Sequence, residues 1–238
     1  MHNSGVWVRS GSLFHQAVLA AFGVSTLAAG AGSPSVNLYQ GNQLGPKVGM
    51  VGDSLTCLSQ KDLEAEFGDK YAYQVSCHNG ISVAEGTPWA VKVDQSVEGS
   101  PAVMIVNLGT NDGLRAEHDV GPHNASDVAA ALQSLNNLAW DIQHVPCVIW
   151  VTVSNIPDIF HSGVTHAMNN WMHSRAQTVP GNYVLDWWTM LTHGNNGAQY
   201  LSPLDGIHTT TAGQQMLATM YYQAVRTDCA AQGIVPGQ

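Results

Sequence analysis

The stretch Lys47-Val48-Gly49-Met50-Val51-Gly52-Asp53-Ser54-Leu55-Thr56 decides the fold. Its apolar first half is typical of a buried strand, and apolar side chains then recur at helical spacing over residues 56–67. Gly52 lies between the two patterns, as is typical of a tight turn. The sequence therefore predicts a strand, a turn and a helix, with Ser54 at the turn, at or near the helix N-cap.

Two roles are open for Ser54 at this point. Serine is a common N-cap residue, and capping alone would explain its place. In open α/β sheets, however, ligands bind at the carboxyl ends of the strands, which is where the Ser54 hydroxyl is expected. The choice depends on whether the partners of a nucleophile follow later in the chain.

The rest of the chain repeats the alternation of strand and helix. Further strands are expected at residues 71–76, 102–108, 147–153 and 182–186, and helices at 87–97, 125–142, 168–179 and 211–229. Pro88 is expected in the first turn of its helix, and Ser126 as the cap of the next. Five strands that alternate with helices predict an α/β fold, a three-layer sandwich with a five-stranded parallel sheet.

Turn clusters follow the apolar strands, and in a parallel sheet these strand ends lie at one edge. Ser54, Gly80, Asn111 and the loop with Asp205 and His208 should therefore converge there, although they are far apart in sequence.

Such a set of residues suits nucleophilic catalysis. A serine hydroxyl is a weak nucleophile until a base takes its proton, and histidine does this well near neutral pH when a carboxylate orients it. Attack on an ester creates an oxyanion, which needs preorganised donors. The backbone N–H groups of Ser54 and Gly80 and the side-chain amide of Asn111 are candidate donors. Glycine at position 80 lets an oxyanion approach the backbone without a Cβ in the way.

With these residues the chain resembles the SGNH hydrolases, also called GDSL esterases and lipases. Gly-Asp-Ser-Leu contains Ser54, Gly-Thr-Asn-Asp contains Asn111, and Asp-Gly-Ile-His ends at His208. The glycine block, His-Asn-Gly-Ile around Gly80, matches more loosely. The resemblance spans residues 47–229 and implies a flavodoxin-like fold, and ester hydrolysis without a metal or other cofactor. It makes Ser54, His208 and Asp205 the catalytic residues.

The pattern Asp-x-x-His occurs three times, so by itself it is weak evidence. Asp141/His144 should lie at the opposite edge of the sheet, whereas Asp158/His161 follow the fourth strand and compete with Asp205/His208. The last pair is preferred because it precedes the final helix, as in the family.

Several other residues have a structural and a functional interpretation. Trp187 and Trp188 are expected to pack in the core or rim, or else to line an acyl or sugar pocket. Asn155 is a turn residue or a cleft residue. Asp53 and Asp112 are interpreted as turn formers that accept backbone N–H bonds, and the remaining histidines, His78, His166 and His193 among them, as loop or surface groups.

The amino-terminal 31 residues resemble an export signal. Arg9 is the only charged residue before Lys47, an apolar run covers residues 13–27, and Ala29-Gly30-Ala31 is a small-residue cleavage site. An uncleaved anchor is the alternative, although the run is short and interrupted for a membrane span. The expected organisation is a signal at 1–31, a linker at 32–46 and a hydrolase domain at 47–238, secreted and without stable membrane insertion after cleavage.

The formal net charge of −9, with only eight Lys and Arg, argues against a nucleic-acid partner. The chain has four cysteines, with no C-x-x-C pair to suggest zinc. In an exported chain an even count favours two disulfides, and in a cytoplasmic one four buried thiols. Their expected places in the sheet predict the pairs Cys57–Cys77 and Cys147–Cys229.

The leading hypothesis is a secreted serine esterase that acts on a small-molecule, glycan or lipid acyl ester. Acyl transfer to an alcohol would use the same residues. A flavodoxin-like cofactor-binding domain is disfavoured because Leu55 follows Ser54 at once, where flavin phosphate needs more N–H donors. A non-catalytic secreted binding module remains a further alternative.

Overall fold

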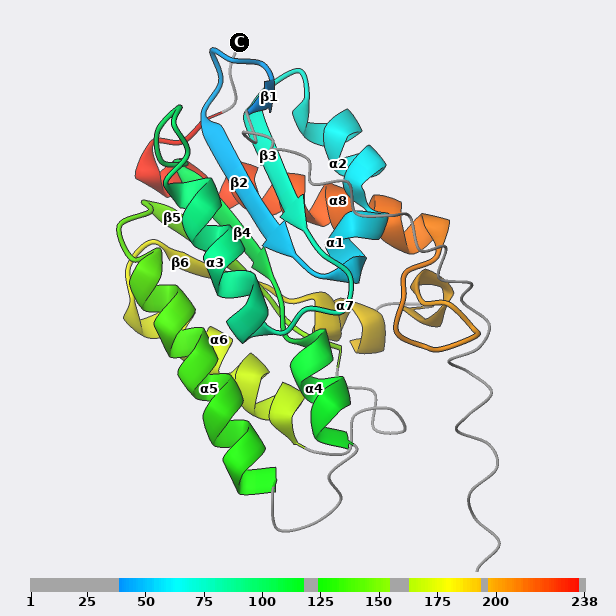
Figure 1. Cartoon of the computed structure of the whole chain (residues 1–238). Coiled ribbons are helices and arrows are strands. Elements are labelled where there is room, and N and C mark those ends of the chain that lie inside the picture. The colour runs from blue at the N-terminus through cyan, green and yellow to red at the C-terminus, as the bar shows by residue number, and fades with distance from the viewer. Residues whose placement is uncertain (1–38, 118–123, 155–162, 194–196, 236–238) are drawn as a thin grey trace, which may run out of the picture. The chain divides into compact units, whose positions relative to one another are not determined.

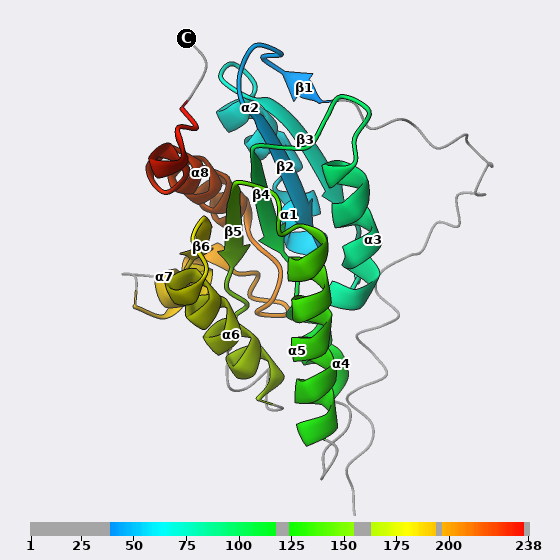
Figure 2. The same ribbon diagram turned by 90° about the vertical axis from the view of Figure 1, so that its left-hand side faces the viewer.

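The computed structural model describes residues 39–117, 124–154, 163–193 and 197–235. The predicted export signal and the first part of the predicted linker lie outside these ranges. Within them, a six-stranded sheet forms the middle of three layers (Figures 1 and 2).

The strand order in the sheet is β1-β3-β2-β4-β5-β6. All neighbours are parallel except β1, which pairs antiparallel with β3. The predicted five parallel strands are thus confirmed, and β1 adds a short edge strand from the stretch predicted as a linker. The strands are β1 Gln40–Gly41, β2 Lys47–Gly52, β3 Ala72–Cys77, β4 Val103–Asn107, β5 Cys147–Val151 and β6 Asn182–Leu185.

Helices cover both faces of the sheet. Buried residues of α1, α2, α7 and α8 pack on one face, and those of α3, α4, α5 and α6 pack on the other. Figure 2 shows the sheet between α8 and α3. The helices are α1 Ser54–Leu58, α2 Gln60–Phe67, α3 Val83–Asp94, α4 Thr110–Glu117, α5 Asn124–Asp141, α6 Val164–Thr178, α7 Trp187–His193 and α8 Thr211–Thr227, with two short 3-10 helices, η1 Gly197–Tyr200 and η2 Cys229–Gln232.

The alternation of side chains along each strand explains the two cores. In β2, Val48 and Met50 contribute to the core on the α8 side, and Val51 to the core on the α3 side. All three are fully buried. A strand that is apolar on both faces needs a helical layer on each side, which is why the continuous apolar runs of the sequence predicted the layering correctly.

The helix predicted at 87–97 begins earlier than expected, and the expected place of Pro88 was wrong. The Ser82 hydroxyl accepts a hydrogen bond from the N–H of Glu85, and the Glu85 carboxylate accepts one from the N–H of Ser82. This reciprocal capping box starts α3 at Val83 and leaves Pro88 inside the helix. Proline lacks the N–H that would bond the carbonyl of the residue four before it, so the helix tolerates one missing bond there.

Other predicted helices also have different bounds. The helix expected over residues 56–67 is two helices, α1 and α2, which meet at Ser59. Ser126 lies inside α5 and does not precede it, because α5 begins at Asn124. Helix α6 begins at Val164, four residues before the predicted start.

Two disulfides connect these elements, Cys57–Cys77 and Cys147–Cys229. These are the pairs expected from the sequence. The first links α1 to the end of β3, and the second links the start of β5 to η2 beyond α8. No helix in the described ranges combines the length and the apolar character that a membrane crossing requires.

Candidate active site

The register of the sheet brings three strand ends side by side. Gly52 at the end of β2 pairs with Cys77 at the end of β3 and with Asn107 at the end of β4. The segments that follow these strands therefore begin at the same edge. They contain Ser54 and the residues around Gly80 and Asn111, which the sequence selected.

The turn before Ser54 is tight because of close packing. A Cβ on Gly52 would lie 2.0 Å from the Oγ1 of Thr56, so no other residue fits there without displacing the first turn of α1. Asp53 is the N-cap, and its Oδ1 accepts a hydrogen bond of 3.0 Å from the N–H of Leu55. Ser54 is thus the first helical residue, next to the N-cap, and its side chain is only half-buried at the strand end.

His208 reaches this serine from the loop between η1 and α8. Its Nε2 lies 3.1 Å from the Oγ of Ser54, and its Nδ1 lies 2.8 Å from the Oδ2 of Asp205. An ionised carboxylate only accepts hydrogen bonds, so Nδ1 donates to Asp205 and leaves Nε2 free to accept the proton of Ser54.

Asp205 is held in place by its own loop. Its Oδ1 accepts hydrogen bonds from the N–H groups of Ile207 and His208 at 2.9 and 3.0 Å. Partial burial raises the pKa of the Asp205 carboxyl, but the hydrogen bonds from the His208 ring and these two N–H groups lower it more, so the net pKa is below its usual value. Asp205 is therefore ionised at neutral pH.

The loop conformation is fixed at both ends. The N–H of Ser202 bonds the carbonyl oxygen of His208, and Leu201 forms an isolated bridge with Thr209. Thr210 then caps α8, because its hydroxyl accepts a hydrogen bond from the N–H of Gly213. These contacts hold the short segment that carries Asp205 and His208 against the start of α8.

Gly80 and Asn111 flank the same edge. Gly80 has a φ of +77°, which favours glycine, and a Cβ there would meet no protein atom within 4 Å. Position 80 therefore requires glycine because of its backbone conformation, and not because neighbouring atoms would exclude a Cβ. The backbone N–H groups of Ser54 and Gly80 donate to no acceptor among the described residues.

Asn111 lies in α4, a helix that the sequence analysis missed. The segment 109–113 is rich in Gly, Thr, Asn and Asp and was interpreted as a turn. The charges gave a signal for a helix, because Asp112 lies in its first turn and Arg115 in its last, as the helix dipole favours. Asn111 donates from Nδ2 to the carbonyl oxygen of Ile81 at 2.9 Å.

Asp53 and Asp112 accept backbone hydrogen bonds, as predicted. Asp53 bonds the N–H of Leu55, and the Oδ2 of Asp112 bonds the N–H of Val83 at 2.9 Å. Asp53 is fully buried, and this burial raises the pKa of its carboxyl to about 6, although the Leu55 N–H lowers it in part.

Other histidines have different surroundings. His144 lies at the opposite edge, as expected, and its Nε2 contacts Asp94, at 2.8 Å. The His78 ring stacks on Trp89, with 3.9 Å between the ring centroids, and burial together with nearby Lys92 lowers the pKa of His78.

Some of the predicted groups lie outside the part of the chain that the structure describes. The competing pair Asp158/His161 and Asn155 lie outside the described residues, and so does the side chain of His193. His166 is exposed on α6 and hydrogen-bonds Asn170.

The two tryptophans after β6 differ. Trp187 is buried in the core on the α8 side. Trp188 is half-buried, and its backbone N–H donates to the Oγ1 of Thr152. Trp187 is therefore a core residue, whereas Trp188 lies next to the end of β5.

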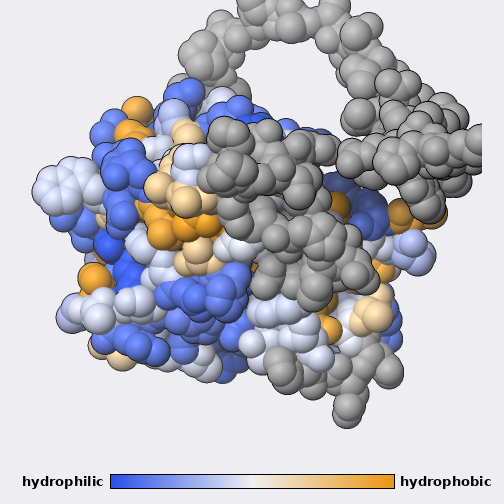
Figure 3. Space-filling model, turned by 90° about the horizontal axis from the view of Figure 1, so that it is seen from below, coloured by the Kyte–Doolittle hydropathy of each residue, from blue (hydrophilic) through white to orange (hydrophobic). Residues whose placement is uncertain are grey.

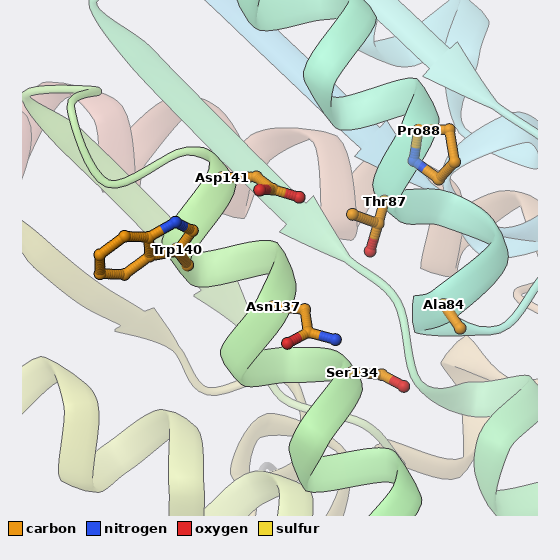
Figure 4. Close-up of a pocket in the computed structure, with 7 residues that line it drawn as sticks. All are labelled: Ala84, Thr87, Pro88, Ser134, Asn137, Trp140 and Asp141. Carbon is orange, nitrogen blue, oxygen red and sulfur yellow. The ribbon is translucent and has the colours of Figure 1, made fainter.

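Figure 3 looks at the side toward which β2 and β4 end, where hydrophilic and hydrophobic residues are mixed. A pocket of about 390 Å³ lies elsewhere, between α3 and α5, and contains none of the predicted site residues (Figure 4). A second pocket, of about 300 Å³, adjoins it at Ala84 and Ser134 and extends to Asp112 and Arg115. No group of three or more His, Cys, Asp or Glu residues suited to a metal ion occurs in the described part of the chain.

Several solved structures are similar to this chain. The C-terminal catalytic domain of peptidoglycan O-acetyltransferase A from Streptococcus pneumoniae, which carries a methylsulfonyl adduct, superposes with a TM-score of 0.60 at 12% identity, covering 84% of this chain and 99% of that one. A lipase/acylhydrolase from Enterococcus faecalis superposes with a TM-score of 0.57 at 16% identity, and the match covers 77% of this chain and 96% of that one. The psychrotrophic esterase EstA from Pseudoalteromonas sp. superposes with a TM-score of 0.57 at 14% identity, and the match covers 78% of this chain and 99% of that one. At these identities the likeness concerns the fold.

A search of curated proteins found no significant match to the sequence. The model of the GDSL-like lipase/acylhydrolase family, in contrast, matches residues 50–216, which include the segments with Ser54, Asn111 and His208. This match covers more than half of the chain. The protein therefore belongs to the GDSL-like lipase/acylhydrolase family.

Proposed function

We propose that the protein is a secreted serine esterase that hydrolyses carboxylic esters. The observation that carries the proposal is the chain of hydrogen bonds from Ser54 through His208 to Asp205, with 3.1 and 2.8 Å between the bonded atoms. A nucleophile, a base and an orienting carboxylate in this order are what ester hydrolysis by serine requires.

In the first half-reaction, the Oγ of Ser54 attacks the ester carbonyl carbon while its proton moves to the Nε2 of His208. The carbonyl oxygen becomes an oxyanion, which the N–H groups of Ser54 and Gly80 and the amide of Asn111 would stabilise. The C–O bond to the leaving alcohol then breaks, and His208 gives the proton that it took from Ser54 to the departing alkoxide. Ser54 is left as an acyl ester.

In the second half-reaction, water attacks the acyl carbon and gives a proton to His208. The bond between the acyl carbon and Oγ breaks, the acid leaves, and the proton returns to Ser54. Asp205 stays ionised and stabilises the imidazolium in both halves. No step uses a metal ion, so activity should survive EDTA.

The test is hydrolysis of p-nitrophenyl acetate by the wild type and by Ser54→Ala. The variant should fold, as judged by circular dichroism, and lose nearly all turnover. A folded Ser54→Ala variant with wild-type turnover would contradict the proposal, as would activity that EDTA abolishes and zinc or calcium restores.

Acyl transfer is the second candidate. The same acyl-enzyme can react with a sugar hydroxyl, and one solved structure with this fold is the catalytic domain of a peptidoglycan O-acetyltransferase. Mass spectrometry of products formed with an added chito-oligosaccharide separates the two functions. Free acetate with an unchanged oligosaccharide supports hydrolysis, and an acetylated oligosaccharide supports transfer.

Export is part of the proposal. The two disulfides support it, since such bonds persist in oxidising compartments. We place the signal at residues 1–31, the linker at 32–46 and the hydrolase domain at 47–238. Amino-terminal sequencing of exported protein should begin at Gly32, and a retained Met1 would favour an anchor.

A further inference from the structure

Arg115 joins α4 to the loop that follows β3. Its Nη2 donates to the carbonyl oxygen of Gly80 at 2.9 Å and lies 2.9 Å from the Oε2 of Glu85. That carboxylate also accepts hydrogen bonds from the N–H and the hydroxyl of Ser82. One guanidinium group therefore contacts both the loop and the first turn of α3.

The hydrogen-bond partners of Glu85 favour its ionised form. Hydrogen bonds from the Ser82 N–H first, and then from Arg115, lower the pKa of the Glu85 carboxyl to about 2. The ion pair with Arg115 is thus present in mildly acidic as well as neutral solution.

Asn111 and Asp112 bind the same loop from the same helix. The amide of Asn111 donates to the carbonyl oxygen of Ile81, and the carboxylate of Asp112 accepts from the N–H of Val83. An asparagine amide has two N–H bonds, and a hydrogen bond from one of them fixes the plane in which the second must point. Asn111 can present that second N–H to an oxyanion only while the Ile81 carbonyl stays in place.

We propose that Arg115 is a positioning residue for the oxyanion site, which holds the loop 80–83 against α4 and thereby orients the amide of Asn111. The two residues are four positions apart and so lie on one face of α4, toward the loop. The proposal rests on the proposed function, since it gives Asn111 the role of an oxyanion donor.

A positioning role has a signature that a structural role lacks. Arg115 and Glu85 are about half exposed, with side-chain accessibilities of 55% and 50%, and exposed ion pairs contribute little to stability. A displaced oxyanion donor, in contrast, weakens binding of the transition state and not of the substrate. Loss of Arg115 should therefore lower kcat and leave KM and Tm nearly unchanged.

The first test compares three variants with p-nitrophenyl acetate as substrate. Arg115→Met should lower kcat about tenfold and change KM less than about twofold. Arg115→Lys should recover part of the loss, because an ammonium group can still donate to the Gly80 carbonyl. The matched control is Arg226→Met, since Arg226 is an exposed arginine of α8 that contacts the ring of Tyr222, and its kcat should be that of the wild type.

A double-mutant cycle tests the route through Asn111. In the background of Asn111→Ala there is no amide to orient, and only an effect through the N–H of Gly80 remains, so Arg115→Met should lower kcat clearly less than it does in the wild-type background. A tenfold loss in both backgrounds would overturn the proposal, because Arg115 would then act independently of Asn111.

Hydrogen exchange separates failure of this proposal from failure of the proposed function. In Arg115→Met the amides of residues 80–85 should exchange faster than in the wild type, with other segments unchanged, and in Arg226→Met they should not. Unchanged exchange together with unchanged kcat overturns the role of Arg115 while hydrolysis by Ser54 stands. If the proposed function itself is wrong, hydrolysis will not depend on Ser54, and the Ser54→Ala variant will keep wild-type turnover.

Discussion

The Nε2 of His208 lies 3.1 Å from the Oγ of Ser54, although 154 positions separate the two residues in the chain. The packing of α8 explains how they meet. Tyr221 and Leu217 of α8 share a core with Leu55, which follows Ser54, and the Tyr221 hydroxyl lies 3.4 Å from that of Thr56. The loop that precedes α8 is thereby brought over the end of β2.

This contact predicts which histidine is the base. His208→Ala should lower kcat for p-nitrophenyl acetate by about 10³-fold or more, since no other group would take the Ser54 proton. Asp205→Asn should cost less, because the carboxylate orients the ring and does not move the proton itself. The competing His161→Ala should stay within about twofold of the wild type. Retained activity in His208→Ala with a large loss in His161→Ala would assign the role to Asp158/His161.

The two disulfides should differ in what their loss affects. Cys147–Cys229 closes a loop of 82 residues and Cys57–Cys77 one of 20. The chain-entropy model gives a loss in the free energy of unfolding of about 4–5 kcal/mol for replacing the first pair by serine and about 3 kcal/mol for the second. Denaturant unfolding measures both values.

Activity should show the opposite order. Cys57–Cys77 joins the helix that begins at Ser54 to the strand before Gly80, so its loss should lower kcat in protein that is still folded. The Cys147–Cys229 variant should retain its kcat below its unfolding temperature. An equal effect of both pairs on kcat would show that the shorter disulfide has no special role at the site.

Buried Asp53 should make stability depend on pH. Burial raises the pKa of its carboxyl from 3.8 to about 6, so the folded state keeps this proton at a pH where the unfolded chain has lost it. The free energy of unfolding therefore decreases as pH rises from about 4 to 6, because the folded state must give up this proton. Above that range the ionised Asp53 destabilises the folded state by a constant amount.

The variant Asp53→Asn tests this dependence. The amide oxygen can still cap α1, but it carries no titratable proton. The free energy of unfolding of Asp53→Asn minus that of the wild type should increase from about pH 4 to pH 7, as measured by urea unfolding. A difference that is constant or decreases over this range would contradict a raised pKa.

The sequence predicted the sheet well because buried parallel strands are continuous apolar runs, as in β4 and β5. It also selected Ser54, Asp205 and His208, and in the structure His208 is within hydrogen-bond distance of both Ser54 and Asp205. The position of Ser54 follows from the parallel topology, since the carboxyl ends of the parallel strands lie at one edge, whereas Asp205 and His208 are brought there by the packing of α8.

The parts that the sequence missed depend on contacts between distant segments. Helix α4 has the composition of a turn, and its hydrogen bonds to Gly80, Ile81 and Val83 are visible only in three dimensions. The two residues of β1 are too few for a periodic pattern. The predicted start of α3 was wrong because it rested on Pro88 alone, whereas the capping box of Ser82 and Glu85 begins the helix at Val83.

The most direct test of the account is covalent labelling of Ser54. The wild-type protein should react with a fluorophosphonate probe at one site, and peptide mapping by mass spectrometry should place the added group on Ser54. Ser54→Ala should remain unlabelled, and His208→Ala should react far more slowly because no base activates the hydroxyl. A folded wild-type protein that takes up no probe, or that takes it up on another residue, would contradict the claim that Ser54 is an activated nucleophile.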